Sequence, residues 1–225
     1  MIRILAFFLI SLVCSNSYGQ EKRALKDLDL DEILAETQFM SDSEDYMEMV
    51  WWIPTEYWEA VYANDTTITP DQAQEIVSLL EQNDLIAVVR GKIGMFGGVN
   101  FDDYETIRNS FDFTYESVKY QPMDPKDLNP DLSNFLSIIK PMLSNMMGNF
   151  GENLHILVYR KPGSNKAVID PFSKKNITFG LGKFETNITL PLGSLLKRKI
   201  CPEDNVLHTA KWNFCPFHGT ALEEQ

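Results

Sequence analysis

The apolar positions of the chain are densest around residues 84–101, which read DLIAVVRGKIGMFGGVNF. Leu85 to Val89 form a β-branched apolar run that is too short for a lone helix and is typical of a buried strand. Gly91 follows this run, and we expect the chain to turn there. A second strand is then expected over residues 93–101, so the stretch predicts a buried hairpin around which the rest of the chain packs.

Three glycines interrupt the second strand of this hairpin, at Gly94, Gly97 and Gly98. They indicate bulges or close backbone packing. Glycines also occur in loops that bind phosphate, but this spacing is not G-x-G-x-x-G and the segment continues into a strand and not a helix. We therefore interpret the glycines as packing positions.

Helical periodicity occurs at four places along the chain. Apolar residues between Leu25 and Leu34 predict a short amphipathic helix, and an acidic linker at 41–45 follows it. Pro54 predicts a helix start and continuation to about Ala63. The other two expected helices run from Thr69-Pro70 to about Asn83 and over 132–147, the latter containing Pro141.

Strand patterns fill most of the remaining chain. Residues 111–120 alternate apolar and polar positions and predict one half-exposed strand. A loop is expected at 121–130, and further strands at 154–159, 177–181 and 184–190. This mixture predicts an α+β fold, a mostly antiparallel sheet packed with several helices, with a small zinc-ribbon-like hairpin at the C-terminus.

The aromatic cluster WWIPTEYW begins at Trp51. Trp51, Trp52 and Trp58 have rings that could stack on a glycan or a peptide, which is one functional alternative. The spacing of Trp58 and Tyr62, four residues apart, is that of a stripe facing a core. Burial of the three indole rings would exclude the stacking role.

Charge and the N-terminus indicate where the protein works. The formal net charge is -12 with a pI near 4.7, and no basic cluster stands out, so we expect no nucleic-acid partner. Residues 1–19 resemble a signal peptide, with Arg3 before an apolar stretch and a cut expected after Gly19. We expect an exported soluble protein, periplasmic or secreted, without a membrane span. Lipidation at Cys14 is a weaker alternative.

The expected organisation has four parts: the signal peptide at 1–19, an acidic helical segment and linker at 20–50, an α+β domain at 51–196, and a zinc-ribbon-like tail at 197–225. No motif of a known catalytic class stands in this sequence. Asp102 and Asp103 are expected to cap a helix or form a turn, and His155 to be a satisfied histidine within a strand. A hydrolase that uses scattered carboxylates such as Asp102 and Asp103 remains an alternative.

The tail carries the most specific pattern of the chain. Cys201-Pro-Glu-Asp204-Asn205 and Cys215-Pro-Phe-His218-Gly219 each consist of a ligand-type residue, a proline, a second ligand-type residue two positions later, and a residue that tolerates positive φ. Residues 201–222 resemble a zinc ribbon in which two of the four cysteines are replaced. Together with WWIPTEYW and GKIGMFGG, this resemblance suggests a family of exported proteins, and it implies no activity.

The resemblance implies a structural zinc site formed by Cys201, Asp204, Cys215 and His218, and His208 is a spare candidate. The competing prediction is a disulfide between the two cysteines, because only these two remain after the signal peptide is removed and export favours oxidation. In both predictions the tail contains a cross-link with a structural role. We therefore expect a non-enzymatic binding or scaffold module whose partner is a protein or a glycan.

Overall fold

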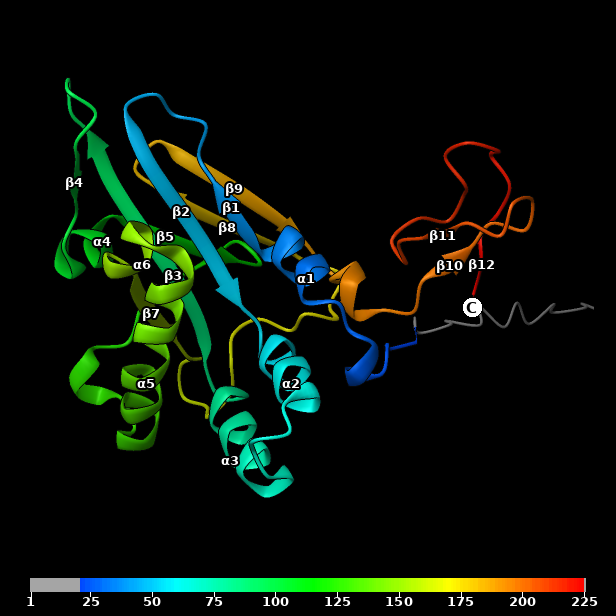
Figure 1. Ribbon diagram of the computed structural model, residues 1–225, viewed down its shortest axis with the longest axis horizontal. Helices are drawn as coiled ribbons and strands as arrows, with labels where there is room; N and C mark the ends of the chain where they lie inside the picture. Colours follow the sequence, from blue (N-terminus) through cyan, green and yellow to red (C-terminus); the bar gives the residue numbers. More distant parts are fainter. Residues whose placement is uncertain (1–20, 225) are drawn as a thin grey trace, which may run out of the picture.

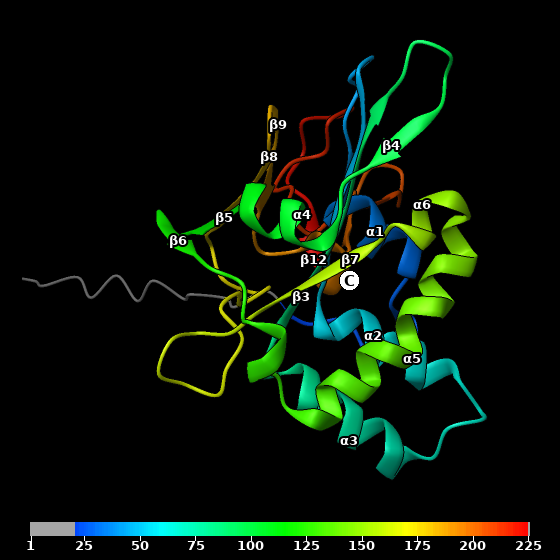
Figure 2. The same cartoon turned by 90° about the vertical axis from the view of Figure 1, so that its left-hand side faces the viewer.

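Strand β3 (Asp84–Ile93) is the centre of the main sheet, as Figures 1 and 2 show. The computed structural model describes residues 21–224, so the predicted signal peptide lies outside the described part of the chain. Within that part, six α-helices and three antiparallel sheets form an α+β fold, which confirms the predicted class. The helices are α1 (Leu30–Thr37), α2 (Thr55–Asn64), α3 (Pro70–Leu80), α4 (Tyr104–Ser110), α5 (Pro130–Met147) and α6 (Asn149–Glu152).

The main sheet has five strands, and β3 pairs with three of them. One edge of β3 pairs with β2 from Leu85 to Lys92, whereas β7 and β4 share the other edge. The strands other than β3 are β1 (Gln38–Met40), β2 (Tyr46–Ile53), β4 (Val99–Phe101) and β7 (His155–Tyr159). The run from Leu85 to Val89 is fully buried, because both faces of the sheet are covered here.

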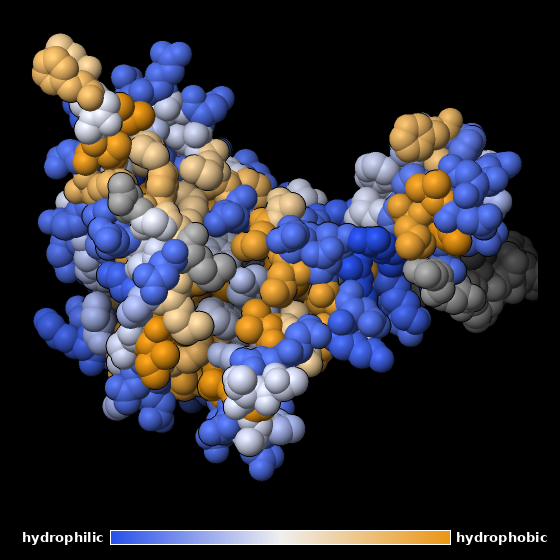
Figure 3. Space-filling model, in the orientation of Figure 1, coloured by the Kyte–Doolittle hydropathy of each residue, from blue (hydrophilic) through white to orange (hydrophobic). Residues whose placement is uncertain are grey.

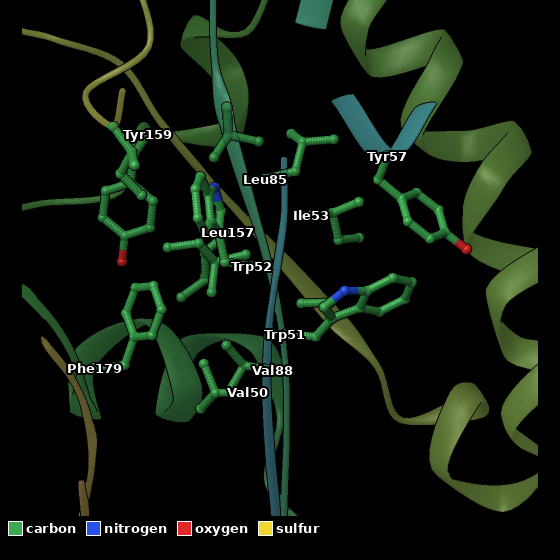
Figure 4. Close-up of a cluster of buried hydrophobic side chains, with 14 of the residues drawn as sticks. Val50, Trp51, Trp52, Ile53, Tyr57, Leu85, Val88, Leu157, Tyr159 and Phe179 are labelled. Atoms are coloured by element: carbon green, nitrogen blue, oxygen red, sulfur yellow. The ribbon is translucent and has the colours of Figure 1, made fainter. Parts of the chain in front are cut away.

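A second sheet covers one face of the main sheet and helices cover the other. Its strand order is β6-β5-β8-β9, with bounds β5 (Phe111–Tyr115), β6 (Val118–Tyr120), β8 (Asn176–Leu181) and β9 (Phe184–Thr189). Phe113 of β5 meets Tyr159 of β7 edge-on, with ring centroids 4.9 Å apart. In Figure 4, Trp52, Tyr159 and Phe179 lie on the side of the second sheet, whereas Trp51 and Tyr57 point to the helical side.

The predicted hairpin at 84–101 is present, but its turn lies further along the chain than expected. Strand β3 continues through Gly91 to Ile93, and the turn occupies residues 94–98, where the Gly94 N–H donates to the Gly98 carbonyl at 2.7 Å. Close packing occurs at Gly91 instead. A Cβ atom there would lie 2.5 Å from Cγ1 of Val99 and 2.8 Å from Cδ1 of Phe101.

The prediction of a single strand at 111–120 was wrong. These residues form a hairpin of the two strands β5 and β6. Glu116 and Ser117 make its two-residue turn with φ values of 52° and 64°. Two consecutive residues with positive φ match the right-handed twist of paired strands, and glycine or asparagine usually occupies such positions. Neither residue type occurs here, so the amino-acid pattern contains no turn signal at this position.

The tryptophan cluster is part of the core. Trp51 and Trp52 belong to β2, and Trp58 lies on α2, which begins directly after Pro54 as expected. Their exposed fractions are only 2%, 1% and 6%. The rings are therefore not accessible for stacking on a glycan or peptide, and this functional alternative is removed.

The N-terminal part of the described chain is continuous with this core. Ile33 of α1 is fully buried, and the loop at 41–45 joins β1 to β2 of the main sheet. The helix α3 begins as predicted, with a capping box between Thr69 and Gln72. None of the helices in residues 21–224 is long and apolar enough to cross a membrane.

The C-terminal segment extends from the core at one end of the molecule (Figure 1). It contains a third sheet of two-residue strands in the order β11-β10-β12. These strands are β10 (Lys199–Ile200), β11 (Leu207–His208) and β12 (Glu223–Glu224). Lys211 connects this segment to the core, because its Nζ lies 2.7 Å from Oε1 of Glu36 on α1.

Candidate metal centre

Two turns with the same hydrogen bonds hold the cysteines of the tail. The carbonyl of Cys201 accepts the N–H of Asn205 at 2.8 Å, and the carbonyl of Cys215 accepts the N–H of Gly219 at 2.8 Å. Each cysteine N–H donates to the carbonyl five residues later, to Val206 at 2.9 Å and to Thr220 at 2.8 Å. The paired spacing in the sequence therefore corresponds to a repeated backbone structure.

The fifth residue of each turn has positive φ, as the sequence predicts. The φ value is 59° at Asn205 and 70° at Gly219. Glycine adopts this region without strain, and asparagine is among the other residues that visit it routinely. The conformation reverses the chain tightly enough that the residue three positions after each cysteine lies beside the sulfur.

Short strand pairs position the two turns next to each other. Lys199 pairs with His208 on either side of the first turn, and Phe214 pairs with Ala221 on either side of the second. The Nζ of Lys199 also donates to the carbonyl of Trp212 at 2.9 Å and to Oδ1 of Asn213 at 3.0 Å. These bonds connect the strand before the first turn to the chain that enters the second.

Three of the four predicted ligand residues converge. His218 Nδ1 lies 3.5 Å from the sulfur of Cys201 and 3.5 Å from the sulfur of Cys215. The three ligand atoms all lie within 4.8 Å of one another. Both sulfurs are free thiols and both cysteines are buried, so no disulfide joins them here.

Asp204 and His208 lie beside this group. Oδ2 of Asp204 lies 3.7 Å from Nδ1 of His218, while its Oδ1 accepts the N–H of Val206 at 3.0 Å. Nε2 of His208 lies 3.6 Å from the sulfur of Cys215. Asp204 points toward the group, as the four-residue prediction requires, and His208 stands where a spare ligand was expected.

The electrostatics of the group favour charged forms of sulfur and imidazole. Burial raises the pKa of the Cys201 thiol, but hydrogen bonds from the Glu203 backbone, Thr220 and His218 outweigh this effect, and the net pKa is lowered. The pKa of His218 is raised, first by its bond to Cys201 and further by the charge of Asp204. Both shifts reflect the close contact of thiol and imidazole, and a metal ion bound between them would take the place of their protons.

The Cys201, Cys215 and His218 group could hold a metal ion. Two thiolates and one imidazole are soft to borderline ligands, which suit Zn²⁺ and related ions better than Ca²⁺ or Mg²⁺. A site with only these three ligands would leave one coordination position for a further group. Asp204 and His208 are the adjacent side chains that could occupy it.

The carboxylates proposed for a hydrolase do not form a paired site. Asp103 is the N-cap of α4 and accepts the N–H of Thr106 at 2.8 Å, and this bond lowers its pKa. Asp102 lies 3.5 Å from Nη1 of Arg90 in an ion pair. Nε2 of His155 lies 3.1 Å from the carbonyl of Asp102, and burial lowers the pKa of that histidine. Asp103 therefore caps a helix and His155 has a hydrogen-bond partner within a strand, as expected, whereas Asp102 forms an ion pair instead of a cap.

Sequence reasoning missed a pair of acids with raised pKa values. Burial raises the pKa of Asp84 to about 7 and that of Glu56 also to about 7, and the charge of Glu56 further raises the pKa of Asp84. Asp84 accepts the N–H groups of Val168 and Ile169 at 2.6 and 3.3 Å, so it anchors the chain that precedes β8. Asp84 stands at the start of the most apolar strand, which was the only signal of its burial.

Comparison with known proteins finds no matching family model, no similar curated protein and no similar solved structure. The resemblance of the tail to a zinc ribbon therefore rests on its residues alone.

Proposed function

We propose that the C-terminal segment binds one structural zinc ion through Cys201, Asp204, Cys215 and His218, and that the protein is an exported, non-enzymatic binding or scaffold module. The observation that carries this proposal is the equal separation of 3.5 Å between Nδ1 of His218 and each cysteine sulfur. In a tetrahedral site with Zn–S of about 2.3 Å and Zn–N of about 2.0–2.1 Å, sulfur and nitrogen lie about 3.5–3.6 Å apart.

The fourth ligand in this proposal is Asp204. A carboxylate oxygen and an imidazole nitrogen on one zinc ion lie about 3.3–3.5 Å apart by the same geometry. The separation from Oδ2 of Asp204 to Nδ1 of His218 is 3.7 Å, so a small rotation of the exposed carboxylate would bring it into range. With four protein ligands the ion has no open position for a substrate, which favours a structural role.

The tail has a small core, which indicates that it needs a cross-link such as this metal site for stability. Its strands have two residues each, and its buried apolar positions are Cys201, Ala210 and Cys215. Segments of this size seldom bury enough apolar surface to be stable without a metal or a disulfide. A zinc ion that joins the two turns would supply this stabilisation.

The surface of the tail supports a role in binding a protein. Its exposed apolar side chains are Val206, Leu207, Trp212, Phe214 and Phe217. Figure 3 shows apolar side chains on the outside of this segment. Large exposed apolar groups on a small rigid support are typical of protein interaction sites.

Elemental analysis of the purified mature protein, paired with thiol titration, tests the metal site. We expect one zinc per chain and two free thiols after chelation. The Cys215→Ser variant should lose the zinc, whereas Phe217→Ala, which changes an exposed side chain between the same ligands, should retain it. A protein with neither metal nor free thiols would establish the disulfide instead.

A separate measurement tests export. Mass spectrometry of the protein from the medium or periplasm should find Gln20 as the first residue. An intact first residue, or a lipid on Cys14, would contradict the proposed localisation.

A further inference from the structure

Each cysteine sulfur of the tail is contacted by a polar side chain that belongs to the other turn. His208 follows the first turn, and its Nε2 lies 3.6 Å from the sulfur of Cys215 in the second turn. Thr220 ends the second turn, and its Oγ1 lies 3.7 Å from the sulfur of Cys201 in the first turn. The two turns therefore exchange one side-chain contact in each direction.

The chemistry of a metal-bound cysteine fixes the direction of both hydrogen bonds. Such a cysteine is a thiolate, which has no proton and can only accept. Nε2 of His208 must then carry a hydrogen, and the hydroxyl of Thr220 must donate its own. Groups that form hydrogen bonds with metal ligands orient those ligands and change how strongly they bind the ion.

The ring of His208 is held in place by its neighbours. The residue is buried in strand β11, where it pairs with Lys199 of β10. Its ring lies 5.7 Å from that of Trp212 and 6.4 Å from that of Phe217, centroid to centroid. Nζ of Lys199 donates to the carbonyl of Trp212 at 2.9 Å and so fixes one of these neighbours. The ring therefore cannot turn freely toward the centre of the ligand group.

The position of His208 is that of an outer group and not of a ligand. In the described part of the chain, the ligand atoms that lie within 4.8 Å of one another are those of Cys201, Cys215 and His218. His208 contacts one of these sulfurs from outside the group. Asp204 also lies outside it, but its exposed carboxylate can rotate inward, whereas the packed ring of His208 cannot.

The charge of the proposed site gives these hydrogen bonds a role. Zn²⁺ with two thiolates, one carboxylate and a neutral imidazole has a net charge of about -1. The excess negative charge makes the sulfurs nucleophilic, and thiolate character controls the reaction of cysteine with electrophiles and oxidants. A hydrogen bond to a sulfur withdraws part of this charge.

We propose that two outer side chains protect the zinc-bound thiolates through hydrogen bonds. His208 donates to Cys215, and Thr220 donates to Cys201. This inference rests on the zinc site proposed above and adds two positioning residues to it. The bonds lower the reactivity of each sulfur without adding a ligand to the ion.

Alkylation of the zinc-loaded full mature protein by iodoacetamide, followed at each cysteine by peptide mass spectrometry, tests this inference. His208→Phe keeps an aromatic ring but has no N–H donor, so Cys215 should react about 10-fold faster, as expected for loss of one hydrogen bond to a charged acceptor. Cys201 should react at the wild-type rate. Thr220→Val should give the opposite result, with Cys201 faster and Cys215 unchanged.

Two measurements separate the hydrogen bond from packing and from coordination. His208→Gln retains an N–H donor and should return the alkylation of Cys215 to near the wild-type rate. In Co²⁺-loaded His208→Phe the visible d–d bands should match those of the wild type, because the four ligands are unchanged. Its sulfur-to-cobalt charge-transfer band should move to lower energy, because the sulfur has lost a donor.

Equal acceleration of both cysteines in His208→Phe would mean that the substitution loosens the whole tail, and this result would overturn the inference. Altered d–d bands would make His208 a ligand and would overturn it as well. Wild-type rates in zinc-loaded His208→Phe would refute the inference alone. A wild-type protein that binds no zinc would refute the metal site itself, and the inference with it.

Discussion

Asn205 and Gly219 occupy the same position in two equivalent turns, with φ values of 59° and 70°. Each of their N–H groups donates at 2.8 Å to the carbonyl of the cysteine four residues earlier. The two turns therefore depend on the backbone conformation of one residue each. A side chain that resists positive φ at either position should distort the ligand group.

Substitution by valine at these two positions should weaken metal binding. Valine in the left-handed region costs about 1–2 kcal/mol, so Asn205→Val and Gly219→Val should each lower the zinc affinity about 5- to 30-fold. A Cβ at position 219 meets no atom within 4 Å, so the effect at that position would come from φ alone. Competition with a zinc-binding dye measures the affinity.

Asn205→Gly is the matched control for these variants, because glycine adopts the same φ without strain. We expect its zinc affinity to equal that of the wild type. If all three variants bound zinc equally, the turn conformation would not control the site.

Gly91 is a packing position, so its substitution should destabilise the fold. In Gly91→Ala the added Cβ would overlap Val99 and Phe101, at a cost of about 1–3 kcal/mol in the free energy of unfolding. Gly98→Ala, in the turn of the same hairpin, meets no atom within 4 Å and should change stability by less than about 0.5 kcal/mol. Urea denaturation of both variants measures the difference, and equal effects would contradict the packing role.

The pair of Arg90 and Glu48 joins β3 to β2 inside the protein, with Nε of Arg90 3.1 Å from Oε1 of a glutamate that is only 4% exposed. Arg90→Met should cost about 3–5 kcal/mol, because it leaves a buried carboxylate without its partner. Lys119→Met removes the exposed pair with Asp112 and should cost less than about 1 kcal/mol. Denaturation curves for the two variants would refute this prediction if their midpoints shifted equally.

Asp84 should make stability depend on pH. Its pKa is about 7 in the folded protein, far above the value of about 3.9 expected in the unfolded chain. Between these values the folded state binds more protons, so this group's contribution to stability is full below about pH 4 and is lost as pH rises through 7. Glu56, with a pKa also near 7, acts in the same direction.

The Asp84→Asn variant tests this linkage, because an amide oxygen can still accept from Val168 and Ile169 and carries no charge. The unfolding free energy of the variant relative to the wild type should increase from pH 5 to pH 8, by at most about 3 kcal/mol. A difference that stays constant with pH would show that Asp84 titrates normally.

The sequence predicted those elements whose signals are local. Thr69-Pro70 defines a helix start through its own hydrogen bonds, and the run after Asp84 defines a strand through its β-branched residues. The positive φ of Asn205 and Gly219 follows in the same way from the residue types. Each of these features is determined within a few residues of the chain.

The features that depended on distant partners were not predicted correctly. Gly91 resembles a turn residue, and only the side chains of β4 show that it is needed for packing. The turn at Glu116 and Ser117 exists because β5 and β6 pair across it, against the preference of both residues. The tail is different: the spacing predicted that Cys201, Cys215 and His218 would converge, and the pairing of β10 with β11 also brings His208, the spare candidate, to Cys215.

Strands β4 and β7 share one edge of β3, and this arrangement has a consequence for how the chain folds. Leu85 pairs with Val158, so during synthesis this β-branched edge has no partner until β7 has been made. Unpaired apolar edges promote aggregation of incomplete chains. A shortened version of the protein that ends before β7 should therefore aggregate, whereas one that ends before β10 retains every strand pair of the two larger sheets.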